Sequence, residues 1–140
     1  MERKTLKVKA IKEHFNFKQV VGDEKSLDRF VLVPNISRPG LELSGFLDHV
    51  EKKRILLIGN KESAYLDTLD NEAYLEERFD FLTDDLTPMC LVTDGNKPHP
   101  CLLKVAKEKN FPVFVSDLKT SEVMVDIITY LDEALAHTTN

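Results

Sequence analysis

Three short apolar runs dominate the hydrophobic pattern of the chain, at residues 55–58, 89–92 and 112–115. They read ILLI, MCLV and PVFV, so each has the length of a β-strand and none alternates between apolar and polar positions. Continuous apolar runs of this length are typical of strands that are covered on both faces, as in a parallel sheet. The pattern therefore predicts three buried strands.

Each run is followed by a segment in which apolar residues recur at helical spacing. After the first run, we predict one short helix and then a second that begins with Asn71 as its N-cap. After the second run a helix ends at Asn110, and after the third a longer helix begins with Thr120 or Ser121 as its cap. The apolar faces of these helices comprise Tyr65, Leu66 and Leu69, then Leu75, Phe79 and Leu82, then Cys101, Leu102, Val105 and Ala106, and finally Val123, Ile127, Leu131 and Leu135.

Strands and helices that alternate in this way are typical of right-handed crossovers onto a parallel sheet. The first fifty residues are less regular and predict short strands at 6–8, 19–21 and 30–33, with a short helix at 10–15. We expect these strands to be extra or edge strands, with antiparallel pairing as one option. The predicted fold is an α/β three-layer domain with a mainly parallel central sheet and extra edge strands from the first fifty residues.

Composition and charge narrow the class of protein. The 140 residues are 42% hydrophobic and 31% charged, which fits one globular domain. A formal charge of −5 argues against nucleic acid and membrane as partners, because both are bound through basic surfaces. The sequence contains no signal-peptide pattern and no apolar run of the roughly 18 residues that a spanning helix needs. We therefore expect a cytoplasmic protein, with Cys90 and Cys101 as reduced thiols in or near the core.

Acidic residues gather in the middle of the chain. Residues 62–85 contain nine carboxylates and a single cation, Arg78, whereas residues 1–18 are basic. A solvated helical face is the simplest explanation of such a tract, and a cation-binding or partner-binding site is the alternative.

The motifs of common active sites are absent from the sequence. With five glycines, the chain has neither GxxxxGK[ST] nor GxGxxG, so a self-contained nucleotide-dependent kinase is not predicted. There is no HExxH pair of histidines and no GxSxG elbow. We therefore assign no catalytic, cofactor-binding or metal-binding residue to this chain.

Two turns are nevertheless candidates for a ligand or partner site. In the segment 35–46, Pro39 and Gly40 form a turn that would hold Arg38 in a defined direction. The first apolar run ends at Gly59, and Glu62 and Ser63 follow shortly after it. A glycine at this place would allow an anion to approach a helix N-terminus, or it serves only a tight turn. The candidate residues are Arg38, Gly40, Glu62 and Ser63.

A third loop, at residues 94–98, follows the second apolar run and thus lies at the carboxyl end of a predicted parallel strand. Open α/β sheets place their ligands at such ends. The loop is interpreted here either as a simple turn or as part of a ligand site.

The segment Ile36–Phe46, ISRPGLELSGF, resembles the ISRPGLELAG(Y/F) signature of the amino-terminal domain of bacterial HPr kinase/phosphorylases. The resemblance extends to RILLIG at 54–59 and TPMCLVT at 87–93. It departs from the family at Asp94, where the usual Thr-Arg-Gly has its cation replaced by an acid. This exchange weakens an anion-binding role for the loop.

The resemblance implies a parent enzyme that phosphorylates a serine of the phosphocarrier HPr with ATP or pyrophosphate and magnesium, and reverses this step by phosphorolysis. In the family, that chemistry belongs to a carboxyl-terminal P-loop domain in a hexamer and governs carbon catabolite control. The resemblance thus implies a noncatalytic domain at residues 1–136, for assembly or regulation. Residues 137–140 are expected to begin the linker to a catalytic domain of the same chain, which would be a partner together with HPr.

Two other functions remain open at this point. The family's amino-terminal domain is similar in fold to DRTGG modules and to the substrate-binding domain of Mur ligases. This similarity makes a stand-alone DRTGG-like sensor of a small anionic metabolite the main alternative, and a purely structural spacer is a third.

Overall fold

A five-stranded sheet forms the centre of the molecule, and four of its strands are parallel. The computed structural model describes residues 5–39 and 53–136. The strand order is β2-β7-β6-β5-β4, and β2 pairs with β7 in antiparallel fashion at one edge. The predicted α/β class, the mainly parallel sheet and the edge strands are confirmed. The strands are β2 (Lys18–Val21), β4 (Ile36–Ser37), β5 (Ile55–Ile58), β6 (Cys90–Val92) and β7 (Val113–Val115).

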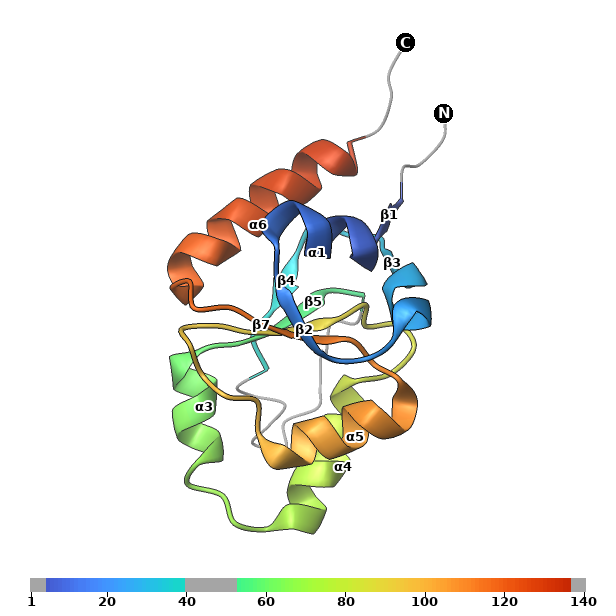
Figure 1. The fold of residues 1–140 in the computed structure, drawn as a ribbon. Coiled ribbons are helices and arrows are strands. Elements are labelled where there is room, and N and C mark those ends of the chain that lie inside the picture. Colours follow the sequence, from blue (N-terminus) through green and yellow to red (C-terminus); the bar gives the residue numbers. More distant parts are fainter. Residues whose placement is uncertain (1–4, 40–52, 137–140) are drawn as a thin grey trace.

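Helices cover both faces of the sheet and give the three predicted layers. In Figure 1, α1 and α6 lie on one side of the strands, and α3, α4 and α5 lie on the other. The helices are α1 (Val8–Phe15), α3 (Asn60–Leu66), α4 (Glu72–Leu82), α5 (Pro100–Lys109) and α6 (Thr120–Ala134).

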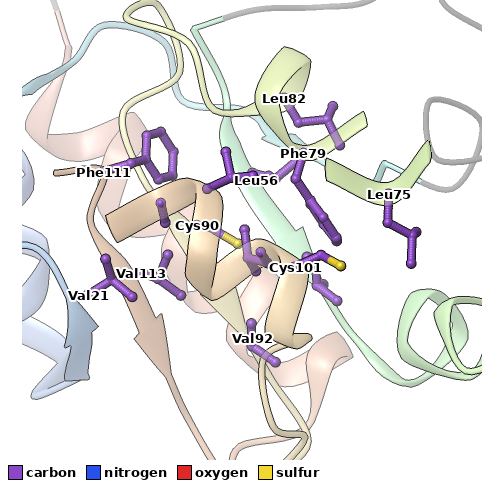
Figure 2. Close-up of a cluster of buried hydrophobic side chains, with 14 of the residues drawn as sticks. Val21, Leu56, Leu75, Phe79, Leu82, Cys90, Val92, Cys101, Phe111 and Val113 are labelled. Carbon is purple, nitrogen blue, oxygen red and sulfur yellow. The ribbon is translucent and has the colours of Figure 1, made fainter. Parts of the chain in front are cut away.

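The two cores on either side of the sheet explain why the central strands are apolar throughout. Successive residues of β5 point to opposite faces. Leu56 and Ile58 pack in the core under α3, α4 and α5, while Ile55 and Leu57 pack in the core under α1 and α6. Figure 2 shows the first of these cores, where Phe79 of α4 lies close to Leu56. A strand buried on both faces cannot alternate in polarity.

Most of the predicted helix ends are correct. The side chain of Asn71 accepts a hydrogen bond from the N–H of Tyr74 and so caps α4. Asn110 ends α5 in the left-handed conformation, with φ of 55°. The predicted cap of α6 is wrong, because Thr120 is already the first helical residue and Lys119 stands at the N-cap without a side-chain hydrogen bond. The Thr120 hydroxyl instead bonds to Asp94.

The first fifty residues differ in part from expectation. β1 (Leu6–Lys7) and β3 (Phe30–Val31) pair with each other in a separate antiparallel sheet, and a short 3-10 helix, η1 (Glu24–Asp28), precedes β3. β1 is short because Val8, fully buried, already begins α1 and donates its N–H to the carbonyl of Arg29. Residues 40–50 lie outside the described part of the chain.

Cys90 and Cys101 are both free and buried, as predicted. Cys90 lies in the central sheet, and burial raises the pKa of its thiol far above the ordinary value. Across residues 5–39 and 53–136, no helix is both long and apolar enough to cross a membrane.

Candidate functional site

The carboxyl ends of the four parallel strands bring together residues from four distant segments. Arg38 follows β4, Gly59 follows β5, Asp94 follows β6, and Thr120 begins α6 after β7. α5 packs on one face of the sheet and α6 on the other, so the connections that leave the neighbouring strands β6 and β7 diverge here. Open α/β sheets bind ligands at such a divergence. This group of residues, the carboxyl-end cluster, is therefore the place to look for a site.

Arg38 and Glu62 form an ion pair in the cluster. Arg38 donates from Nε to Oε1 of Glu62 at 3.0 Å, and from Nη2 to Oε1 at 2.7 Å and to Oε2 at 3.0 Å. The Glu62 side chain is 6% exposed and that of Arg38 is 32% exposed. A fork of donors on a single carboxylate is the strongest ion-pair geometry available to proteins. Arg38 is thus largely neutralised from within the molecule.

Glu62 also accepts a hydrogen bond from the backbone N–H of Gly59, at 2.7 Å from Oε1. This N–H lies at the start of α3 and has no hydrogen-bond acceptor within the helix. Gly59 has a φ of −108°, so its backbone does not require glycine. A Cβ at this position would overlap the hydroxyl of Thr120 and approach Nη2 of Arg38 to 3.1 Å. The glycine therefore permits the protein's own side chains to approach closely.

Asp94 takes the equivalent position at the start of α6. Its carboxylate accepts from the backbone N–H of Thr120 at 3.2 Å and, through a short hydrogen bond, from the Thr120 hydroxyl. The same hydroxyl lies 2.7 Å from that of Thr93. The pKa of Asp94 lies below its ordinary value, mainly because the Thr120 hydroxyl donates to the carboxylate. Burial raises this pKa. The backbone N–H groups of Thr120 and Asn60 and the charge of Arg38 lower it further. Asp94 therefore stays ionised and fills the position of an external anion.

An open depression of about 450 Å³ lies over this cluster. Its rim carries the cations of Arg38, Lys61 and Lys119, and Asp94 lies among them. Two of the places that would attract a phosphate, the fork of Arg38 and the first N–H of α6, are already occupied by Glu62 and Asp94. Within the described part of the chain, these two groups are therefore unavailable to a nucleotide phosphate.

The structure brings together only part of the predicted site. Arg38 and Glu62 lie side by side, but Ser63 lines a different cavity on the α3–α5 side of the sheet. Gly40 lies outside the described residues. The sequence did not single out Thr120 as a member of the cluster, and the only signal for it was its place at the start of a helix. Among the described residues, no group of three or more His, Cys, Asp or Glu could hold a metal ion.

Comparison with known proteins decides the family. The model of the family described as "HPr Serine kinase N terminus" matches residues 6–131. The chain belongs to this HPr serine kinase N-terminal family. The resemblance in the ISRPGLELSGF segment is thereby confirmed over almost the whole domain.

Curated proteins similar to the chain include HPr kinase/phosphorylases of several bacteria. The chain is 32% identical to that of Bacillus subtilis over 135 residues, which is 96% of this chain and 43% of the relative. It is 33% identical to that of Listeria innocua over 133 residues, covering 95% of this chain and 42% of the relative. It is 33% identical to that of Enterococcus faecalis over 131 residues, which is 94% of this chain and 42% of the relative. The chain thus spans less than half the length of these relatives.

The fold of the chain is similar to that of a solved regulatory protein. It contains the CBS and DRTGG domains of the regulatory region of Clostridium perfringens pyrophosphatase, complexed with the activator diadenosine tetraphosphate. The TM-score is 0.59 at 12% identity, with coverage of 95% of this chain and 51% of that chain. At this identity, the likeness establishes the fold alone.

Proposed function

We propose that this chain acts as the noncatalytic amino-terminal domain of an HPr kinase/phosphorylase and serves assembly or regulation. The parent enzyme would phosphorylate a serine of HPr with ATP or pyrophosphate and magnesium, and would remove the phosphate by phosphorolysis. The catalytic domain of the same chain, HPr and a hexameric parent are the partners that follow from this proposal. Its compartment would be the cytoplasm.

The observation that carries the proposal is the coverage of the relatives. The family model matches residues 6–131, whereas HPr kinase/phosphorylases are matched over 42–43% of their length. Two further features support a noncatalytic role. The chain has no glycine-rich phosphate loop, and Glu62 and Asp94 already bind the Arg38 guanidinium and the first N–H of α6.

The test is a phosphorylation assay with the purified chain, HPr, ATP and magnesium. We expect no phosphoserine on HPr, because the sequence lacks the glycine-rich loop that would hold the triphosphate for in-line transfer. The full-length enzyme of Bacillus subtilis is the positive control. Phosphoserine formed by the purified chain alone would contradict the proposal.

The second candidate function is a sensor of a small anionic metabolite, which is favoured by the fold shared with the DRTGG-containing regulatory region. Thermal denaturation with diadenosine tetraphosphate, nucleotides and sugar phosphates tests it. A ligand at 100 times its Kd stabilises a fold by about 2.7 kcal/mol, which is readily measured. Because Glu62 and Asp94 occupy two of the groups that would bind an anion, the Arg38 guanidinium and the first N–H of α6, we expect no stabilisation. A shift that is lost in the Arg38→Ala variant would establish the sensor instead.

A further inference from the structure

A second cavity, of about 280 Å³, lies between α3 and the loop that leads from β6 into α5. It is separate from the depression over the carboxyl-end cluster, which shares none of its lining residues. Its lining has three aliphatic residues, four polar residues and two prolines, namely Ile58, Leu66 and Val92, then Ser63, Asp67, Lys97 and His99, and finally Pro98 and Pro100.

The floor of this cavity is apolar and belongs to the core. Ile58 ends β5, Val92 ends β6, and Leu66 ends α3. These side chains are 2%, 0% and 3% exposed, so they are held in place by the surrounding packing. A floor of branched aliphatic side chains attracts the apolar body of a ligand and offers it no hydrogen bond.

The wall formed by the loop is preformed. Pro98 and Pro100 each have a fixed φ, and Pro100 is the first residue of α5. His99, between them, accepts a hydrogen bond at Nδ1 from the N–H of Cys101, at 3.1 Å. With Nδ1 engaged as an acceptor, the neutral ring carries its proton on Nε2, the nitrogen that remains to donate to a ligand. The cavity can therefore bind without first ordering this wall.

The polar side chains around the cavity include hydrogen-bond donors that a carboxylate could use. Within residues 5–39 and 53–136, neither the ammonium of Lys97 nor the hydroxyl of Ser63 forms a hydrogen bond or ion pair. Both are hydrogen-bond donors, and the ten-residue helix α5 begins at this wall with the positive end of its dipole. Asp67 balances the charge of Lys97 in the lining, and the absence of excess positive charge there disfavours a doubly charged phosphate.

We propose that this cavity binds a small monocarboxylate with a short, branched apolar body. The aliphatic chain would lie on Ile58, Leu66 and Val92, and the carboxylate would accept hydrogen bonds from Lys97, Ser63 and Nε2 of His99. The proposal does not depend on the function of the parent enzyme.

The experiment is a titration of the purified chain with 3-methylbutanoate, followed through the methyl resonances in ¹³C-resolved NMR spectra. We expect saturable shifts at Ile58, Leu66 and Val92, with a Kd on the order of 1 mM for so small a ligand. The methyl groups of Ile127 and Leu131 lie in the core on the other face of the sheet and should not move. Two further probes are 3-methylbutanamide, which is uncharged, and inorganic phosphate, and both should bind more weakly.

Two matched variants test whether the ammonium of Lys97 binds the carboxylate of the ligand. Lys97→Gln removes the cation at the cavity, whereas Lys61→Gln removes an exposed cation that lines the other depression. We expect Lys97→Gln to raise the Kd by about threefold or more, as for an exposed ion pair, and Lys61→Gln to leave it unchanged. The proposal is overturned if the three methyl groups show no saturable shift, if the amide or phosphate binds as well as the carboxylate, or if the two variants behave alike.

Discussion

Arg38 illustrates how one side chain can bear on both stability and binding. Its guanidinium would be a strong anion-binding group if it were free, but it forks onto the nearly buried carboxylate of Glu62. A carboxylate so little exposed depends on its partner, because removing one member of a buried pair leaves an uncompensated charge. The primary role of Arg38 in the isolated domain is therefore to hold Glu62 and, through it, the start of α3.

The Arg38→Ala variant tests this role. We expect it to lower the free energy of unfolding by about 2 kcal/mol, less than for a fully buried pair because Arg38 is partly exposed. Adding Glu62→Gln should recover part of the loss, because the amide oxygen still accepts from Gly59 and no charge remains. Urea denaturation measures the free energy of unfolding of both variants.

The control is Lys7→Ala, which removes an ion pair with Asp28 in which both side chains are more than half exposed. This substitution should lower the free energy of unfolding by less than about 0.5 kcal/mol. A loss in Arg38→Ala no larger than in this control would contradict the assignment.

At the scale of elements, the central strands and the helices α4 and α5 could be predicted because their signals are local. Asn71 caps α4 and Asn110 ends α5 through contacts within a few residues. The start of α6 could not be predicted in this way, since Thr120 bonds to Asp94, which is 26 residues away. The pairing of β1 with β3 depends likewise on where α1 begins. Local helix and strand propensities do not predict such hydrogen bonds between residues that are far apart in the sequence.

Asn110 joins two elements as well as ending one. It closes α5 with a φ of 55°, and its side chain donates to the carboxylate of Asp23 at 2.8 Å and accepts from the N–H of Asp23 at 3.0 Å. This hydrogen bond is the main reason that the pKa of Asp23 lies below its ordinary value, which burial partly opposes. The interaction is therefore present at neutral pH and is lost as the pH falls through the folded-state pKa of Asp23.

Substitutions of Asn110 separate its backbone role, which is to end α5, from the hydrogen bonds of its side chain to Asp23. Asn110→Gly keeps the left-handed backbone and should raise the pKa of Asp23 toward its ordinary value, which an NMR titration of the carboxyl group measures. Asn110→Ala should cause the same pKa change and should also destabilise the domain by about 1 kcal/mol relative to the glycine variant, because alanine is strained at positive φ. An unchanged Asp23 pKa in both variants would contradict this account.

For the whole molecule, the distribution of charge becomes intelligible once the layers are known. Of the acidic tract at 62–85, Glu62 is buried in the carboxyl-end cluster, while Glu76 and Asp80 pair with Lys104 and Lys109 of α5. Most of the other carboxylates are exposed on α3, α4 and the adjoining turns. The expected solvated face thus accounts for most of the tract but not for Glu62. Sequence position alone could not separate this residue from its exposed neighbours, because its partner Arg38 is 24 positions away.

The antiparallel edge strand β2 sets an order for the assembly of the domain. Its partner β7 comes late in the chain, and the hydrogen bonds between Asp23 and Asn110 span 87 positions. During synthesis on the ribosome, β2 must therefore remain unpaired until β7, at Val113–Val115, has emerged. The last helix, α6, then covers the hydrophobic side chains of α1 and the sheet. Nascent chains released before that point would expose apolar surface and would be substrates for chaperones and proteases.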